Sequence, residues 1–143
     1  MSSHHRHLHL LDLPNEILFL IFKKLDNVDV LYSLLDINNQ RLDILAHQQI
    51  FSTILNFVST SDINDDISSI PNSMLDRFCV SILPRVHENV KSLIIEPMSM
   101  ERILCAGAYP NLTELKVFNF NKEFVSRHLI SKILMCNDLL ILI

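Results

Sequence analysis

The sequence predicts a mixed α+β protein, with three short helices at the N-terminus followed by an α/β segment with parallel strands. Two observations carry this prediction. Apolar residues recur at helical spacing between residues 13 and 48. Further on, the pattern Asn-[Val/Leu]-x-x-Leu-x-[Ile/Val] occurs at 89–95 and again at 111–117, an offset of 22 residues. The chain has 143 residues, 49% of them hydrophobic, which fits one small domain or two very small ones.

Composition and charge exclude several functional classes. The chain contains one glycine, Gly107, so it has neither a G-x-G-x-x-G motif nor a P-loop, and no G-x-S-x-G nucleophile elbow. The formal net charge is −4, and acidic residues outnumber basic ones in both halves of the chain. Without a basic patch, the electrostatic signature of nucleic-acid or anionic-membrane binding is missing.

No residue pattern indicates catalysis, a cofactor or a metal site. The histidines beyond residue 40 are isolated and belong to no H-E-x-x-H motif. The three cysteines, Cys79, Cys105 and Cys136, have spacings that fit no thiolate metal site. An enzyme would need a pocket of polar groups with perturbed pKa values. We therefore expect a protein that is not an enzyme and that holds no cofactor.

Residues 1–11 resemble a disordered, His-rich tail rather than a signal peptide, because they lack the long apolar stretch of one. The longest apolar run, residues 17–22, is too short to span a membrane. In the absence of an entry signal we expect a cytoplasmic or nuclear protein with reduced thiols and no membrane partner.

Residues 13–25 predict the first helix. Pro14 suits its first turn and Asp12 its N-terminal cap, and the lysines near its end complement the helix dipole. Successive residues of a helix lie about 100° apart around its axis, and on this spacing the main group of apolar side chains covers half of the helix circumference. Phe19 and Leu20 lie outside that half. A surface helix needs a narrower stripe. The extra apolar surface of this helix predicts that a helical partner packs against it, unless the rest of the chain covers that surface.

The apolar pattern predicts a second helix over residues 29–37 and a third over residues 40–48. Asp29 is the expected N-cap of the second, and Asn38 and Asn39 are expected to end it and to cap the third. The side chains expected to face inward are Val30, Leu31, Leu34, Leu35 and Ile37 in the second helix and Leu42, Leu45 and Ala46 in the third. Together these helices define a first unit over residues 12–48.

Residues 49–70 predict an extended segment followed by a linker. The stretch 50–58 is rich in β-branched and aromatic residues, whereas 59–70 is polar and turn-rich. Residues 71–83 then predict a helix that Pro84 ends.

The two copies of the repeat predict neighbouring parallel strands at 90–95 and 112–117. Leu93 and Leu115 occupy the same position in each copy and are expected to point into the same layer. Because the copies are related by a 22-residue step, a shared sheet with a crossover helix between them is expected.

Helices are expected to follow each of these strands. Ser99 is the expected cap of the first, which Gly107 closes, and a second helix is expected over 122–134. Residues 137–143 predict a third strand. The 22-residue step lies within the 20–29 range of leucine-rich repeats, so 71–143 is predicted to be a leucine-rich-repeat-like segment; the alternative is an ordinary α/β region with coincidental spacing.

The segment 12–46 resembles an F-box, whose pattern is roughly L-P-x-E-[IL]-[IL]-x-x-[IL]-[FL]-x-x-L followed by D-[LV]-[LV]-x-x-[LS]. The matching positions are LPNEIL at 13–18, IF at 21–22, Leu25, DVL at 29–31 and Leu34. The resemblance covers about a quarter of the chain. It departs in the third helix, where positions 37–38 and 40–42 hold Ile-Asn and Gln-Arg-Leu in place of the family's frequent Val-Cys and Trp.

The resemblance implies that the helices dock on a Skp-type adaptor, which links them to a cullin–RING ubiquitin ligase. The domain beyond an F-box holds an unknown protein substrate, and a leucine-rich repeat is a common substrate domain in this family. The adaptor-binding residues carried over are Leu13, Pro14, Ile17, Leu18, Ile21, Phe22, Leu25, Val30, Leu31 and Leu34. Which of them face the adaptor and which face the internal core stays open.

There is one alternative to a ligase adaptor. In this alternative the chain is a non-catalytic interaction or structural fragment, and its F-box-like helices pack on the repeat segment without ligase assembly. The repeat is also expected to be truncated, because two strands and a terminal strand fall short of the three capped units that such arrays need. An apolar last strand with unpaired backbone groups leads us to expect self-association unless the adaptor is bound.

Overall fold

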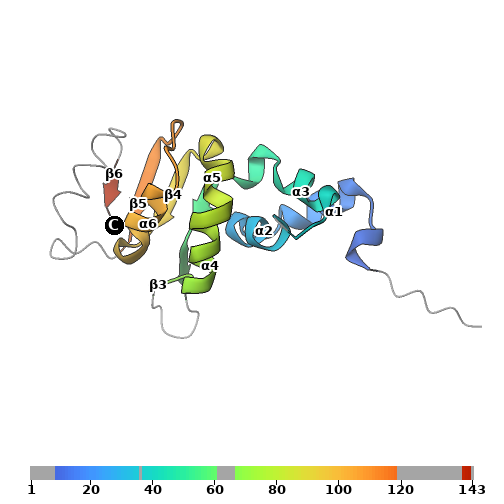
Figure 1. Cartoon of the computed structure of the whole chain (residues 1–143), viewed down its shortest axis with the longest axis horizontal. Coiled ribbons are helices and arrows are strands. Elements are labelled where there is room, and N and C mark those ends of the chain that lie inside the picture. The colour runs from blue at the N-terminus through green and yellow to red at the C-terminus, as the bar shows by residue number, and fades with distance from the viewer. Residues whose placement is uncertain (1–8, 36, 61–66, 119–139, 143) are drawn as a thin grey trace, which may run out of the picture.

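The computed structural model describes residues 9–35, 37–60, 67–118 and 140–142 (Figure 1). It combines helices with a parallel sheet, which confirms the predicted α+β class. The N-terminal part contains η1 (Leu10–Asp12), α1 (Asn15–Phe22), α2 (Asn27–Leu34) and α3 (Gln40–Ala46). The 3-10 turn η1 overlaps the end of the segment 1–11 that is predicted to be a disordered tail, so that prediction is wrong for residues 10–11; residues 1–8 lie outside the described part.

The ends of α1 and α2 differ from the sequence prediction. Pro14 is the N-cap of α1 rather than a residue of its first turn, and the Asp12 carboxylate accepts from the amide of His9 in η1 instead of capping α1. The N-cap of α2 is Asp26, not Asp29, so the helix starts two residues before the predicted cap. Ile37 lies beyond α2 and is exposed rather than inward-facing.

The turn between α2 and α3 follows the prediction. Asn38 has a φ of 58°, a left-handed conformation that asparagine tolerates better than most residues and that breaks the helical path. The side chain of Asn39 then accepts from the amide of Leu42 at 3.1 Å and caps α3. Leu42 and Ala46 are both buried, as is Leu45.

A four-stranded parallel sheet forms the other end of the molecule. Its strands are β1 (Ile54–Asn56), β4 (Ser92–Ile95), β5 (Glu114–Val117) and β6 (Leu140–Leu142), in the order β1-β4-β5-β6. Leu93 pairs in register with Leu115, and both are buried, so the predicted neighbouring parallel strands are confirmed. The predicted third strand is present as β6 at the sheet edge, whereas the predicted helix at 122–134 lies outside the described residues.

The segment predicted as a linker contains a hairpin. Strands β2 (Val58–Thr60) and β3 (Ile67–Ser69) pair antiparallel and form a second, two-stranded sheet. Before them, η2 (Gln49–Phe51) occupies the start of the stretch predicted to be extended. The linker prediction is therefore wrong at both flanks, because short polar strands gain backbone hydrogen bonds from each other that their composition does not reveal.

The helix predicted to end before Pro84 continues past it. It runs as α4 (Asn72–Arg77), the π-helical turn η3 (Phe78–Ile82) and α5 (Leu83–Val86), and leads into the 3-10 turn η4 (His87–Asn89). Within an α-helix a proline ring clashes with the carbonyl four residues earlier. In the wider π turn, the Leu83 amide bonds the Phe78 carbonyl, which makes room for Pro84.

The crossover helix α6 (Pro97–Cys105) joins β4 to β5. It starts at Pro97 rather than at Ser99, whose hydroxyl donates to the carbonyl of the true N-cap, Glu96, at 3.3 Å. Gly107 follows the end of α6 but does not have a positive φ. Its small size is needed for a different reason, because a Cβ there would lie 2.5 Å from the Cβ of His87.

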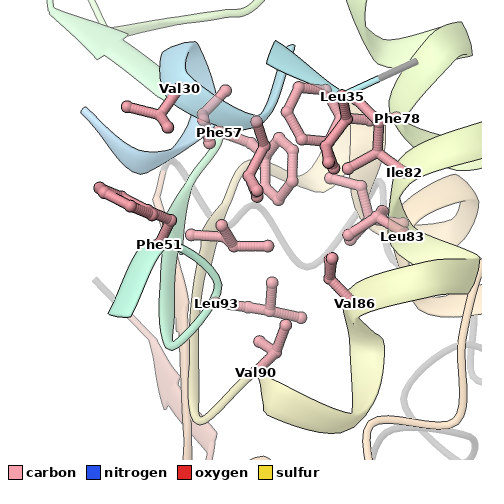
Figure 2. Close-up of a cluster of buried hydrophobic side chains, with 14 of the residues drawn as sticks. Val30, Leu35, Phe51, Phe57, Phe78, Ile82, Leu83, Val86, Val90 and Leu93 are labelled. Carbon is pink, nitrogen blue, oxygen red and sulfur yellow. The ribbon is translucent and has the colours of Figure 1, made fainter. Parts of the chain in front are cut away.

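One continuous hydrophobic core joins the two parts of the chain. Buried apolar side chains run without a break from Leu18 in α1 to Val117 in β5. Figure 2 draws Val30 and Leu35 of the N-terminal part in the same cluster as Phe78. The rod formed by α4, η3 and α5 lies between the N-terminal helices and the sheet (Figure 1). The helices of residues 12–48 therefore do not have a core of their own.

Candidate protein-interaction site on the N-terminal helices

The ten residues that the sequence nominates for adaptor binding divide by burial. Five of them are buried in the core, namely Leu18, Phe22, Val30, Leu31 and Leu34. Leu13 and Ile21 are half-buried and pack against that core. Pro14, Ile17 and Leu25 are exposed. The motif thus has two roles, since half of its apolar side chains complete the fold and a minority remain on the surface.

The exposed face of α1 is apolar at its centre. Ile17 is 42% exposed and Leu20, one turn on, is 55% exposed. Leu20 is absent from the nominated set, although its position beyond the main apolar arc signals a second apolar face. Leu18 on the opposite side of the same helix is fully buried. Helix α1 therefore presents apolar side chains to solvent and to the core at once.

A shallow groove runs beside Leu20, between α1 and α3. It is lined by Asn15, Glu16, Phe19, Leu20, Leu45 and Gln48. The Phe19 ring, which lines the groove, packs edge-on against the Phe51 ring with 5.6 Å between the ring centroids. The Lys23 ammonium lies 5.6 Å from the Phe19 ring centre at the far end. The groove is suited to receive one apolar side chain with a polar rim around it.

Arg41 fixes the chain that enters α1. Its guanidinium on α3 donates to the carbonyls of Leu11, at 2.7 Å, and of Leu13, and to the side-chain oxygen of Asn15. Three bonds from one planar fork hold the Leu-Pro entry segment against α3. Sequence reasoning noted Arg41 only as a departure from the family pattern, since a bond across 26 or more residues leaves no local signal.

The N-terminal helices are tied to the α/β part by polar contacts as well as by the core. The Asn27 amide at the start of α2 donates to the carbonyls of Ile54, at 2.9 Å, and Ile50, at 3.3 Å. Arg77 of α4 donates to the carbonyl of Leu35 and lies 4.7 Å from the Tyr32 ring centre. These contacts hold α2 against β1 and α4.

A second polar cluster joins α3 to α5. Arg85 contacts the Asp43 carboxylate at 3.3 Å and Nε2 of His47 at 3.1 Å, and Nδ1 of His47 lies 2.7 Å from the Asp43 carbonyl. All three side chains are partly exposed, so the cluster braces the two helices at the surface.

No family model, curated protein or solved structure matches this chain. The function must therefore be argued from the residues and their geometry.

The described residues contain neither a candidate metal site nor a helix that could span a membrane. Among the described residues, no group of three or more His, Cys, Asp or Glu side chains is placed to hold a metal ion. The described helices also lack the combination of length and apolarity that a bilayer span requires. Burial raises the pKa of the Tyr109 phenol and of the Cys79 thiol, and the Tyr109 hydroxyl donates to the Ile103 carbonyl inside the core. Shifts of this kind come from packing.

Proposed function

We propose that this chain is the substrate-recognition adaptor of a Skp–cullin–F-box ubiquitin ligase and binds a Skp-type adaptor through its N-terminal helices. The observation that carries the proposal is the double role of α1. Leu18 and Phe22 of the F-box-like motif are buried, yet Ile17 and Leu20 stay on the surface, and Leu20 lines a shallow groove. A solvent-exposed apolar helix face with a polar rim is typical of a helix-docking surface.

The position of this face supports the proposal. Helices α1 and α3 lie at the end of the molecule farthest from the parallel sheet (Figure 1). A partner bound there leaves the sheet accessible to a second protein, as a substrate-recognition adaptor requires. The regular pairing of β4 with β5 at a 22-residue step is compatible with a leucine-rich-repeat-like substrate domain.

One observation favours a second candidate, a structural or interaction protein without ligase assembly. Helix α2 buries Val30 and Leu31 against the same core as the α/β part, and Asn27 bonds β1 directly. Part of the apolar surface that the sequence assigns to an adaptor is therefore covered by the chain itself. In this alternative, the remaining exposed face of α1 binds no Skp-type adaptor.

Co-expression with a tagged Skp-type adaptor separates the two. We expect the wild-type chain to co-purify with the adaptor, and the Ile17→Asp variant to be lost from it because an aspartate in the contact carries an unpaired charge. Met98→Asp is the matched control, since Met98 is 78% exposed on α6, in the α/β part of the chain. Failure of the wild-type chain to co-purify, with the chain folded, would favour the alternative.

A further inference from the structure

Opposite charges lie at the start of α1 and in the turn just beyond its end. Glu16 lies in the first turn, and Lys24 lies in the turn that follows Phe22, where its amide donates to the Ile21 carbonyl at 3.1 Å. The two residues are eight positions apart, which corresponds to about 12 Å along the direction of α1 at the rise of a helix. Leu20 lies midway between the two. Among the described residues no ion pair involves Glu16 or Lys24.

This arrangement makes α1 complementary to a second copy of itself. A two-fold axis passing at Leu20 sets two α1 helices antiparallel, and Glu16 of each copy then lies opposite the partner's Lys24. A parallel arrangement would instead place like charges together at both ends, so the charges select the antiparallel one.

The groove provides a place for the side chain at the axis. Phe19 and Leu45 line it next to Leu20, which projects into solvent with 55% of its surface exposed. In the two-fold arrangement each Leu20 enters the partner's groove. Asn15 and Gln48 at the rim remain able to hydrogen-bond water.

We propose that two copies of this chain pair through α1 as an antiparallel, two-fold symmetric dimer. A contact formed by one short helix from each copy is expected to be smaller than the roughly 800 Å² per partner of a standard interface, so we expect a weak and transient dimer. Because the dimer covers Leu20, it and adaptor binding exclude each other. This exclusion rests on the proposed function, whereas the dimer itself does not.

Sedimentation velocity of the full chain over a range of concentrations tests the dimer. We expect Glu16→Lys and Lys24→Glu each to weaken dimerisation at least about tenfold, because two symmetric attractions become repulsions. An equimolar mixture of the two variants should dimerise again, since each copy then carries the charges that the other lacks. High salt should weaken the wild-type dimer. Met98→Asp should leave it unchanged, and thermal melts confirm that each variant is folded.

Three results would overturn the proposal: a wild-type chain that stays monomeric at hundreds of micromolar, an association that the charge variants do not alter, or a mixture that fails to dimerise. An association insensitive to the charges would place the contact elsewhere, for example at the β6 edge of the sheet. Adaptor binding is measured separately, by titration of the adaptor at a chain concentration well below the dimer dissociation constant. The loss of one interaction is therefore distinguishable from the loss of the other.

Discussion

The side-chain amide of Asn27 bonds the carbonyl of Ile54 at 2.9 Å and so joins the first turn of α2 to strand β1. The same amide also bonds the carbonyl of Ile50. The two bonds connect the N-terminal helices to the sheet, and they satisfy two backbone carbonyls that face the start of α2. The helices and the sheet therefore fold as one unit, and the orientation of α1 depends on contacts made by the α/β part.

We expect Asn27→Ala to lower the free energy of unfolding by about 1–2 kcal/mol, because two carbonyl oxygens lose their donor. Urea unfolding followed by circular dichroism gives the value. Asn72→Ala, at the exposed start of α4, is the control and should change stability by less than about 0.5 kcal/mol. An Asn27 variant as stable as this control would contradict the role assigned to the amide.

Gly107 is predicted to tolerate no larger side chain. A Cβ there would lie 2.5 Å from Cβ and 2.8 Å from Cγ of His87, so Gly107→Ala should destabilise the fold by about 1–3 kcal/mol. Combining it with His87→Gly removes both the Cβ and the Cγ that the new methyl group meets, so the double variant should be more stable than the sum of the two single effects predicts. Additive effects in this thermal or chemical unfolding cycle would rule out the clash as the cause.

Leu18 and Leu20 are predicted to behave oppositely although they lie on the same helix. Leu18→Ala should cost about 3 kcal/mol of folding free energy, since its side chain is fully buried. Leu20→Ala should cost less than about 0.5 kcal/mol because its side chain faces solvent. Denaturant midpoints of the two variants test this. Similar losses for both would mean that the two faces of α1 are wrongly assigned.

Stability should fall at alkaline pH. Burial raises the pKa of Tyr109, with Cys79 and Cys105 adding to it, and burial followed by Cys105 raises the pKa of Cys79. The folded state thus holds these protons to higher pH than the unfolded state does. The stability that these two groups contribute is fully present below the pKa values that they have in the unfolded chain, near 8.5 for a thiol and 10 for a phenol. It decreases as the pH rises above those values.

Tyr109→Phe separates the two groups. It should remove most of the decrease above about pH 10 and leave the earlier part due to Cys79. At pH 7 it should cost about 1 kcal/mol, because the hydroxyl bond to the Ile103 carbonyl is lost. Urea unfolding at several pH values gives both effects, and a variant with an unchanged pH profile would contradict this assignment.

Local patterns were enough to predict several elements. The inward positions of α3, the Asn39 cap, and the pairing of Leu93 with Leu115 all follow from periodicity or from the repeated step. The N-cap of α2 at Asp26 and the start of α6 at Pro97 differ from the prediction, because Asp29 and Ser99 are also residue types that commonly cap helices.

Other features depend on contacts that the sequence does not display. Strand β1 pairs with β4 across an intervening hairpin and helix, and no repeat marks that partner. Which face of α1 is buried was decided by Phe51 and the rest of the core, so Leu18 and Leu20 could not be distinguished by apolarity alone. Arg41 was likewise invisible as the residue that holds the Leu-Pro segment.

The affinity of the purified chain for a purified Skp-type adaptor, measured by isothermal titration calorimetry, tests the central claim most directly. We predict measurable binding by the wild-type chain, unchanged binding by Met98→Asp, and at least about a hundredfold loss for the combined Ile17→Asp and Leu20→Asp variant. Circular dichroism must show that all three are folded. No binding by the folded wild-type chain, or equal binding by the α1 variant, would contradict the account.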